Sequence, residues 1–215
     1  MRHVRAIATD YDETLAEIGF VPDRHLRAME RFRASGRLLI LNTGRGLEDL
    51  LIVFPEIDRF DALVLENGTI LVDPITREER LLADPLPESF LADLHRRGVS
   101  PIPKRRVIVD TWAIHEAEIR RAIHHAGLDL HLIFNQNTVM VLPAGVDKGS
   151  GLRAMLAGTG ITVDHVAGIG DGDNDLGLLE ACGIKVAVPN AVPELLAKAD
   201  HILTFEELVD AILIQ

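Results

Sequence analysis

The sequence predicts an α/β protein with a parallel-sheet core into which a small α+β unit is inserted. Over residues 1–74, and again over 146–215, short apolar runs alternate with segments of helical spacing. Strands separated by helices in this way form parallel sheets with right-handed crossovers. Over residues 75–145, prolines and basic residues cluster instead. We therefore expect a core of residues 1–74 and 146–215, and an α+β insert of residues 75–145.

The first part of the core has distinct helix and turn signals. Residues 22–35 predict a helix, because a proline stands at the start, apolar residues recur at helical spacing and a glycine follows. A shorter helix is expected over 46–54. The pair Asn67-Gly68 is typical of a tight turn and predicts a hairpin that continues through residues 69–72. Buried strands are expected over residues 4–9, 38–41 and 62–65.

The remaining elements are predicted from the same periodicities. In the insert we expect helices over residues 87–97 and 115–126, and strands over 107–111, 130–134 and 138–142, the last two forming a hairpin. In the second part of the core we expect helices over residues 148–157, 175–181 and 192–198, and strands over 165–169 and 185–188. Residues 202–203 and 205–213 are the last two segments of the alternating pattern.

Composition excludes several classes of function. The net charge of −11 argues against a nucleic-acid partner and against an anionic membrane surface. The apolar runs are too short to cross a bilayer, and the first residues show no secretory pattern. Cys182 is the only cysteine, so an internal disulfide is impossible. We expect a cytoplasmic protein, either a monomer or a homodimer. The negative net charge would repel a small anionic substrate at long range, so such a substrate would need a metal ion and local cations.

Two aspartates directly follow the first expected strand. Asp10 and Asp12 share a face in an extended segment, so their carboxylates can converge at the edge of the sheet where parallel-sheet enzymes place their sites. Converged carboxylates repel unless a cation or a proton lies between them, and Mg²⁺ prefers such oxygen ligands. A solvated acidic turn is the alternative interpretation of this motif alone.

Polar residues also follow the second strand. Thr43, Gly44 and Arg45 bring a hydroxyl, a flexible backbone and exposed N–H groups to a helix start, which together suit an anion. Ordinary N-capping by Thr43 is the alternative. Lys148 stands in the first turn of another expected helix, where its charge opposes the helix dipole. A bound phosphate or a facing carboxylate would remove that conflict, whereas an exposed lysine is the simpler interpretation.

The most unusual segment is the acidic loop after the strand at 165–169. Asp171, Asp173, Asn174 and Asp175 crowd this strand-to-helix junction, and their repulsion is costly without a cation. The segment lacks the GxGxxG spacing of a dinucleotide loop, and its charge would repel a pyrophosphate. A metal site is therefore predicted here.

Together the motifs resemble the haloacid dehalogenase superfamily. Asp-x-Asp-x-Thr after the first strand, Thr-Gly-Arg after the second, a later lysine and Gly-Asp-x-x-Asn-Asp occur in that order along the chain. The Asn67-Gly68 hairpin and the position of the insert are similar to the type IIB, or Cof-like, branch. Within it the short insert resembles archaeal-type phosphoglycolate phosphatases and sugar-phosphate phosphatases. The resemblance implies a Rossmann-like core and a cap domain that closes over the site.

The resemblance also implies roles for individual residues. Asp10 would be the nucleophile that forms a phosphoryl-aspartate, and Asp12 the general acid and base. Mg²⁺ would be the cofactor, and a small phosphorylated metabolite such as phosphoglycolate or a sugar phosphate the substrate. The implied catalytic residues are Asp10, Asp12, Thr43 and Lys148. The implied metal ligands are Asp10, Asp12, Asp171 and Asp175. The implied substrate-binding residues are Thr43, Gly44, Arg45, Asn67, Gly68, Lys148 and Asn174.

Two points stay open at this stage. The family usually has glycine where this chain has Glu13, and a glutamate at a left-handed backbone position costs about 1–2 kcal/mol. A phosphomutase of the same superfamily would share every motif, and a non-enzymatic Mg²⁺- or phosphate-binding module is a third reading.

In the insert, the candidates for contacting the substrate are Lys104, Arg105, Arg106, Asn135 and Asn137.

Overall fold

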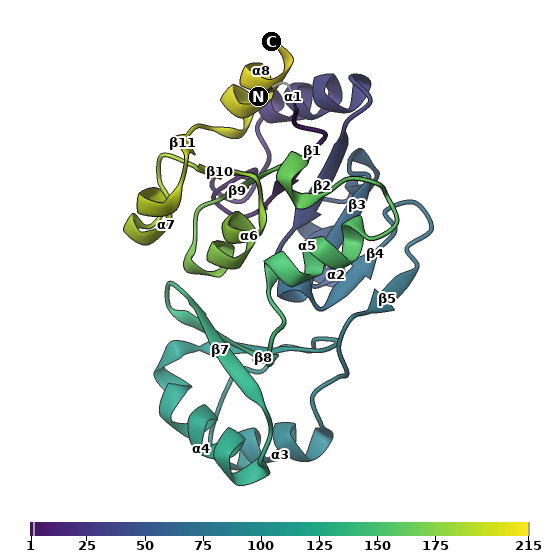
Figure 1. Ribbon diagram of the computed structural model, residues 1–215. Helices are drawn as coiled ribbons and strands as arrows, with labels where there is room; N and C mark the ends of the chain where they lie inside the picture. Colours follow the sequence, from purple (N-terminus) through teal and green to yellow (C-terminus); the bar gives the residue numbers. More distant parts are fainter. Residues whose placement is uncertain (2, 215) are drawn as a thin grey trace.

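The computed structural model describes every residue except 2 and 215. Its centre is an eight-stranded sheet in the order β11-β10-β9-β1-β2-β3-β4-β5 (Figure 1). The strands from β11 to β3 run parallel, whereas β4 and β5 are antiparallel additions at one edge. The strands are β1 (Ala6–Thr9), β2 (Leu38–Asn42), β3 (Ala62–Leu65), β4 (Ile70–Val72), β5 (Glu79–Leu81), β9 (Val166–Gly170), β10 (Ile184–Ala187) and β11 (His201–Ile202).

Helices pack against this sheet in pairs. Helix α1 contacts α8, and α5 contacts α6. The inner strands β1, β2 and β9 are almost wholly buried, as a parallel sheet covered by helices requires. The helices of the core are α1 (Asp23–Ala34), α2 (Leu47–Val53), α5 (Lys148–Leu156), α6 (Leu176–Ala181), α7 (Pro193–Lys198) and α8 (Phe205–Leu213). The α/β fold class predicted from the sequence is confirmed.

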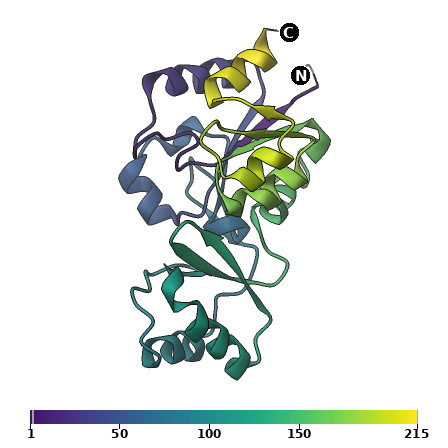
Figure 2. The same cartoon turned by 90° about the vertical axis from the view of Figure 1, so that its left-hand side faces the viewer.

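The insert forms a second lobe at one end of the core (Figure 2). Its antiparallel sheet has the order β6-β8-β7, and α3 packs against α4. A small apolar cluster that includes Phe90, Leu94, Ile119 and Val141 is its own core. Its elements are α3 (Glu88–Arg96), β6 (Val109–Trp112), α4 (Glu116–Ala126), β7 (Leu130–Asn135) and β8 (Thr138–Pro143).

Three details differ from the sequence-based prediction. Strand β5 lies inside the range assigned to the insert, yet it pairs with β4, so the large sheet extends to Leu81. Strand β6 begins at Val109 rather than at residue 107, because the backbone N–H groups of Val107 and Ile108 donate to Glu66 instead of pairing with β8. The β3–β4 hairpin is present, but its connection is a four-residue turn over 66–69 rather than a two-residue one.

Among the described residues, no helix combines the length and the apolar character that a membrane crossing requires.

Candidate active site

The candidate site lies where three neighbouring parallel strands end. Asp10 follows β1, Thr43 follows β2 and Asp171 follows β9. Because β1 pairs in parallel with both β2 and β9, the three loops leave the same edge of the sheet side by side. This is the edge at which α/β proteins bind ligands. The fold therefore brings together residues that are far apart in the chain.

Lys148 lies at the centre of the site. Its Nζ donates to Asp10 Oδ1 at 2.6 Å and to Asp175 Oδ1 at 2.6 Å, and its side chain is fully buried. Burial opposes the lysine charge, but the two carboxylates outweigh it and raise the pKa of Lys148 above its ordinary value. The two facing carboxylates also offset the unfavourable interaction between the Lys148 charge and the dipole of α5. The alternative interpretation of Lys148 as an exposed surface residue is therefore wrong.

Three carboxylates form a cluster beside this lysine. Asp10, Asp171 and Asp175 offer oxygen atoms that lie within 4.8 Å of one another. Burial, together with repulsion from the other two aspartates, raises the pKa of Asp10 well above its usual range despite the ion pair with Lys148. Burial and repulsion from Asp175 raise the pKa of Asp171 to about 6.

Hydrogen bonds fix the orientation of this cluster. Asp175 Oδ2 accepts from the backbone N–H groups of Asp171 and Gly172, and Asp171 Oδ1 accepts from the Thr14 hydroxyl at 3.0 Å. Such an all-oxygen, mutually repelling and oriented donor set fits a hard divalent cation. Asn174 Oδ1 is buried beside it and has no hydrogen-bond partner among the described residues. A cation with its bound water, or a substrate, would supply one.

The carboxylate of Asp12 does not converge with that of Asp10. It accepts two hydrogen bonds from Arg45, from Nε to Oδ2 at 2.8 Å and from Nη2 to Oδ1 at 2.7 Å. The guanidinium also lies over the Tyr11 ring, 5.6 Å from its centroid. The predicted convergence of the two side chains is thus corrected: Lys148 holds Asp10 on one side, and Arg45 holds Asp12 on the other. Any contact of Asp12 with a metal is left to its backbone carbonyl.

The remaining predicted residues divide into two groups. Gly44 lies against Asn67, since a Cβ on Gly44 would be 3.2 Å from the Asn67 amide nitrogen, and Asn174 Nδ2 donates to Asn67 Oδ1 at 3.2 Å. These residues do converge. Gly68 does not point into the site: it has a φ of 97°, and a Cβ there would lie 1.9 Å from the Asp147 carbonyl oxygen. Its role is to let the β3–β4 turn pack against α5.

A cavity of about 300 Å³ opens over this site between the core and the insert. The core contributes Asp10, Asp12, Thr43, Gly44, Arg45 and Asn174, and the insert contributes Arg105, Asp110, Asn135, Thr138 and Met140.

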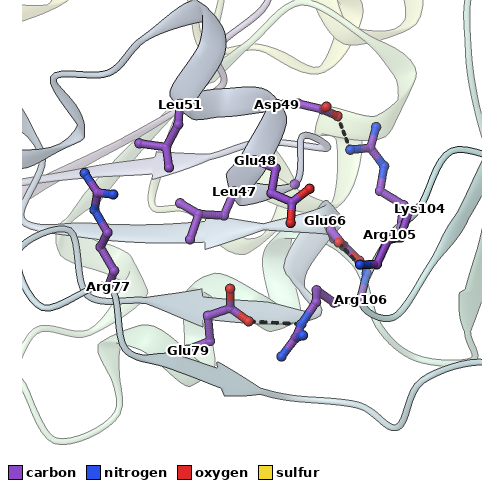
Figure 3. Close-up of a pocket in the computed structure, with 11 residues that line it drawn as sticks. Leu47, Glu48, Asp49, Leu51, Glu66, Arg77, Glu79, Lys104, Arg105 and Arg106 are labelled. Atoms are coloured by element: carbon purple, nitrogen blue, oxygen red, sulfur yellow. Dashed lines mark hydrogen bonds and ion pairs between the residues drawn. The ribbon is translucent and has the colours of Figure 1, made fainter.

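Of the basic and amide residues predicted to contact the substrate from the insert, only some line this cavity. Arg105 and Asn135 do. Lys104 and Arg106 instead line a separate hollow of about 250 Å³ between α2, β5 and the insert, which Arg105 also borders (Figure 3). Asn137 is exposed, and its carbonyl oxygen accepts from the Ala113 N–H at 2.8 Å.

Glu66 is a residue that the sequence analysis missed. Its buried carboxylate accepts from three successive N–H groups of the insert, those of Arg106 at 2.8 Å, Val107 at 2.9 Å and Ile108 at 3.3 Å. It therefore attaches the insert to the end of β3 (Figure 3). The one available signal was an acidic residue between a buried strand and a turn, which is too common to be informative.

Comparison with known proteins decides the family. The model of the haloacid dehalogenase-like hydrolases matches residues 7–98 and 107–213. The chain belongs to this family. The resemblance inferred from the motifs is thereby confirmed.

Relatives of this hydrolase cover nearly its whole length. A phosphoglycolate phosphatase of Methanothermobacter thermautotrophicus is 30% identical over 210 residues, with 93% of this chain and 91% of the relative covered. A phosphoglycolate phosphatase of Sulfurisphaera tokodaii is 26% identical, with 94% and 88% covered. In fold, the hydrolase matches a Thermoplasma acidophilum protein with a TM-score of 0.80 at 17% identity, covering 97% and 96% of the two chains. A sugar phosphatase of subclass IIB matches with a TM-score of 0.76 at 18% identity, covering 95% of each chain.

Proposed function

We propose that this hydrolase cleaves the phosphate monoester of a small metabolite through a phosphoryl-aspartate at Asp10, with Mg²⁺ as cofactor. The observation that carries the proposal is the position of Asp10. Its carboxylate borders the cavity, and one of its oxygens is hydrogen-bonded to the buried Lys148 at 2.6 Å. A carboxylate so placed is a nucleophile at the floor of a substrate-sized cavity.

The reaction would proceed in two steps. Asp10 attacks phosphorus, so that an aspartyl oxygen–phosphorus bond forms while the bond to the leaving oxygen breaks, and Asp12 gives its proton to the departing alcohol. Asp12 then takes a proton from a water molecule that attacks the phosphorus, which releases phosphate and restores Asp10. The two hydrogen bonds from Arg45 hold Asp12 at the cavity wall, where its side chain is 45% exposed. They favour the carboxylate form that accepts the proton of water, and one of them must be released while Asp12 carries the proton for the leaving alcohol.

The other residues stabilise charge. Lys148 would balance the negative charge of Asp10 and the phosphoryl oxygens, and Thr43 with the Gly44 backbone would bind the phosphoryl group. Asp10, Asp171, Asp175 and the backbone carbonyl of Asp12 would hold Mg²⁺. The ion would draw nucleophile and phosphate together and screen their repulsion.

The insert is proposed to act as the cap. The sequence assigned residues 75–145 to it, and the pairing of β5 with β4 supports a boundary after Leu81. A closed cap over a cavity of about 300 Å³ limits the substrate to a small metabolite. Phosphoglycolate and small sugar phosphates are the candidates, the first supported by the names of the relatives. The charge of −11 supports a protein that binds no nucleic acid, and the single cysteine supports a cytoplasmic location.

The test is phosphate release from a panel of phosphorylated metabolites, with Mg²⁺ or with EDTA, for the wild type and Asp10→Asn. We expect release by the wild type with Mg²⁺ only, and none above background by the variant. Equal rates for both proteins on a good substrate would overturn the mechanism. Product analysis with a sugar bisphosphate as activator separates hydrolysis from phosphomutase activity. A protein that binds Mg²⁺ but turns over nothing would be a binding module.

A further inference from the structure

Among the residues that the structure describes, Arg105 is the one cation that the insert contributes to the wall of the active-site cavity. Its side chain is only 11% exposed and is fully engaged. Nε donates to Asp110 Oδ1 at 3.0 Å, Nη2 donates to Asp110 Oδ2 at 2.9 Å, and Nη1 pairs with Asp49 of α2. Figure 3 shows the bond between Arg105 and Asp49. Two carboxylates share one guanidinium, so this group of three carries a net negative charge.

The core side of the same wall is also neutralised. Arg45, the cation that faces the cavity from the core loop after β2, forms its two-pronged ion pair with Asp12. Asp10 lies at the floor, where it is paired with Lys148, and the remaining polar side chains of the lining, Thr43, Asn135, Thr138 and Asn174, are uncharged. The Thr138 hydroxyl donates to the Asn135 carbonyl at 2.7 Å and keeps its oxygen as an acceptor, and Asn174 Oδ1 is an acceptor without a partner among the described residues.

This wall suits hydroxyl groups and disfavours a carboxylate. A hydroxyl on the leaving group can donate to Asp110, whose two oxygens each retain a lone pair beyond their bond to Arg105. A carboxylate there would meet a like charge in a partly desolvated place, and among the described residues of the wall no free cation would compensate it.

We propose that Asp110, positioned by Arg105, is the residue that determines leaving-group specificity, and that it selects phosphate esters of neutral, hydroxyl-bearing alcohols over phosphate esters that carry a carboxylate. This inference rests on the proposed function. It separates this hydrolase from the relatives named phosphoglycolate phosphatases, since the phosphoglycolate leaving group is a carboxylate-bearing alcohol.

The test uses two esters of nearly equal size, 2-phosphoglycolate and 2-hydroxyethyl phosphate, which differ only in a carboxylate against a hydroxymethyl group. We expect the kcat/KM of the wild type to be about tenfold higher for 2-hydroxyethyl phosphate or more. In Asp110→Asn, which keeps the shape of the side chain but removes its charge, the ratio of the two values should fall at least several-fold. The change should come mainly from a lower KM for 2-phosphoglycolate.

A second variant tests the same proposal independently if Asp110→Asn does not fold. Asp49→Asn leaves the Arg105–Asp110 pair intact but frees part of the guanidinium, so it should also shift the ratio toward 2-phosphoglycolate. Asp210→Asn is the matched control, because Asp210 pairs with Arg31 on the outer surface of the core, and its ratio should equal that of the wild type.

The outcomes distinguish the two proposals. A wild type that prefers 2-phosphoglycolate, or a ratio that stays unchanged in both Asp110→Asn and Asp49→Asn, overturns the role of Asp110 while leaving the phosphatase intact. If neither ester nor any member of the metabolite panel releases phosphate in the presence of Mg²⁺, the proposed function itself fails, and the specificity proposal with it.

Discussion

Lys148 Nζ and Asp10 Oδ1 lie 2.6 Å apart although 138 residues separate them in the chain. The contact exists because the long side chain of Lys148, the first residue of α5, reaches Asp10 in the loop after β1, and it places a buried cation against a buried carboxylate. Asp175 accepts from the same ammonium group at 2.6 Å. The site therefore holds one cation and at least two anions away from water, which is an unfavourable balance that a bound divalent cation would correct. This balance leads to the first two predictions.

Replacing Lys148 with methionine should destabilise the fold as well as abolish activity. Methionine has a similar length but leaves Asp10 and Asp175 without their buried partner, and breaking such a pair costs about 3–5 kcal/mol. Urea unfolding without divalent ions should show this loss, and Mg²⁺ should recover part of it. Lys198→Met is the control: Lys198 is 42% exposed and pairs with Glu180 at 2.9 Å, so the change should be below about 1 kcal/mol. Equal stability of Lys148→Met and the wild type would contradict the prediction.

Asp10→Asn should have the opposite effect on stability. The high pKa of Asp10 means that its charge is poorly accommodated when no metal is bound, and asparagine removes the charge while keeping an acceptor for Lys148. Without divalent ions we expect the free energy of unfolding to rise by about 1 kcal/mol, as is common when a functional charge is removed. Calorimetry should then give a Tm about 2–4 °C above that of the wild type. A lower Tm would show that the charge of Asp10 stabilises the fold.

The sequence predicted the large features because they depend on local patterns. The buried runs that became β1, β2, β3 and β9 identified the parallel sheet, and a parallel sheet places the ends of its strands together. That rule suffices to bring Asp10, Thr43 and Asp171 into one site. It does not say where each side chain points, which is why the pairing of Asp12 with Arg45 was not foreseen.

Other features escaped prediction for equally physical reasons. Strand β5 reads Glu-Arg-Leu, with no apolar run, because it is an edge strand that is mostly exposed. Glu66 looks like any surface glutamate until the insert folds back and offers three N–H groups to it. Contacts of this kind join distant segments and leave no periodic trace in the chain.

Glu13→Gly should stabilise the protein slightly. Glu13 has a φ of 53°, the left-handed conformation that the sequence analysis considered, and this costs a residue with a Cβ about 1–2 kcal/mol. Glycine removes that cost but loses about 0.5–1 kcal/mol through its more flexible unfolded state. The net gain should be about 0.5–1 kcal/mol in urea unfolding. Glu48→Gly, in the first turn of α2, is the contrast: with an ordinary helical backbone it should lose stability. If Glu13→Gly lost as much free energy of unfolding as Glu48→Gly, the backbone at Glu13 would not be strained.

Asp93→Asn should weaken the insert at neutral pH and matter less in acid. Asp93 accepts from Arg97 Nε at 2.9 Å and from Arg96 Nη2 at 3.0 Å, and chiefly the bond from Arg97 lowers its pKa to about 2. A folded-state pKa below the unfolded value of about 3.9 contributes stability that is complete above that value and disappears as the pH falls through about 2. By pH 3 about half of it should be gone.

The measurement is the Tm difference between the wild type and Asp93→Asn at pH 6 and at pH 3. Circular dichroism at each pH confirms that both proteins start folded. The gap should narrow markedly at pH 3. A gap of the same size at both values would mean that the shape of the side chain, rather than its ionisation, supports α3.

Glu66→Ala should loosen the attachment of the insert to the core. Its carboxylate is the acceptor for the N–H groups of residues 106–108, and burying those groups unpaired costs about 1–3 kcal/mol each. Because a water molecule can enter the space left by the side chain, we expect a total loss near 3 kcal/mol rather than the full sum. Limited proteolysis should also show faster cleavage within residues 101–108.

Glu79→Gln separates the two ways in which this loop is held. Glu79 pairs with Arg106, whose side chain is 61% exposed, so loss of that ion pair should cost less than about 1 kcal/mol and leave the cleavage rate nearly unchanged. If Glu79→Gln instead exposed the loop to protease as strongly as Glu66→Ala, the ion pair on the surface would be the main attachment. In that case water would satisfy the three N–H groups as well as the Glu66 carboxylate does, and Glu66 would contribute little to the attachment.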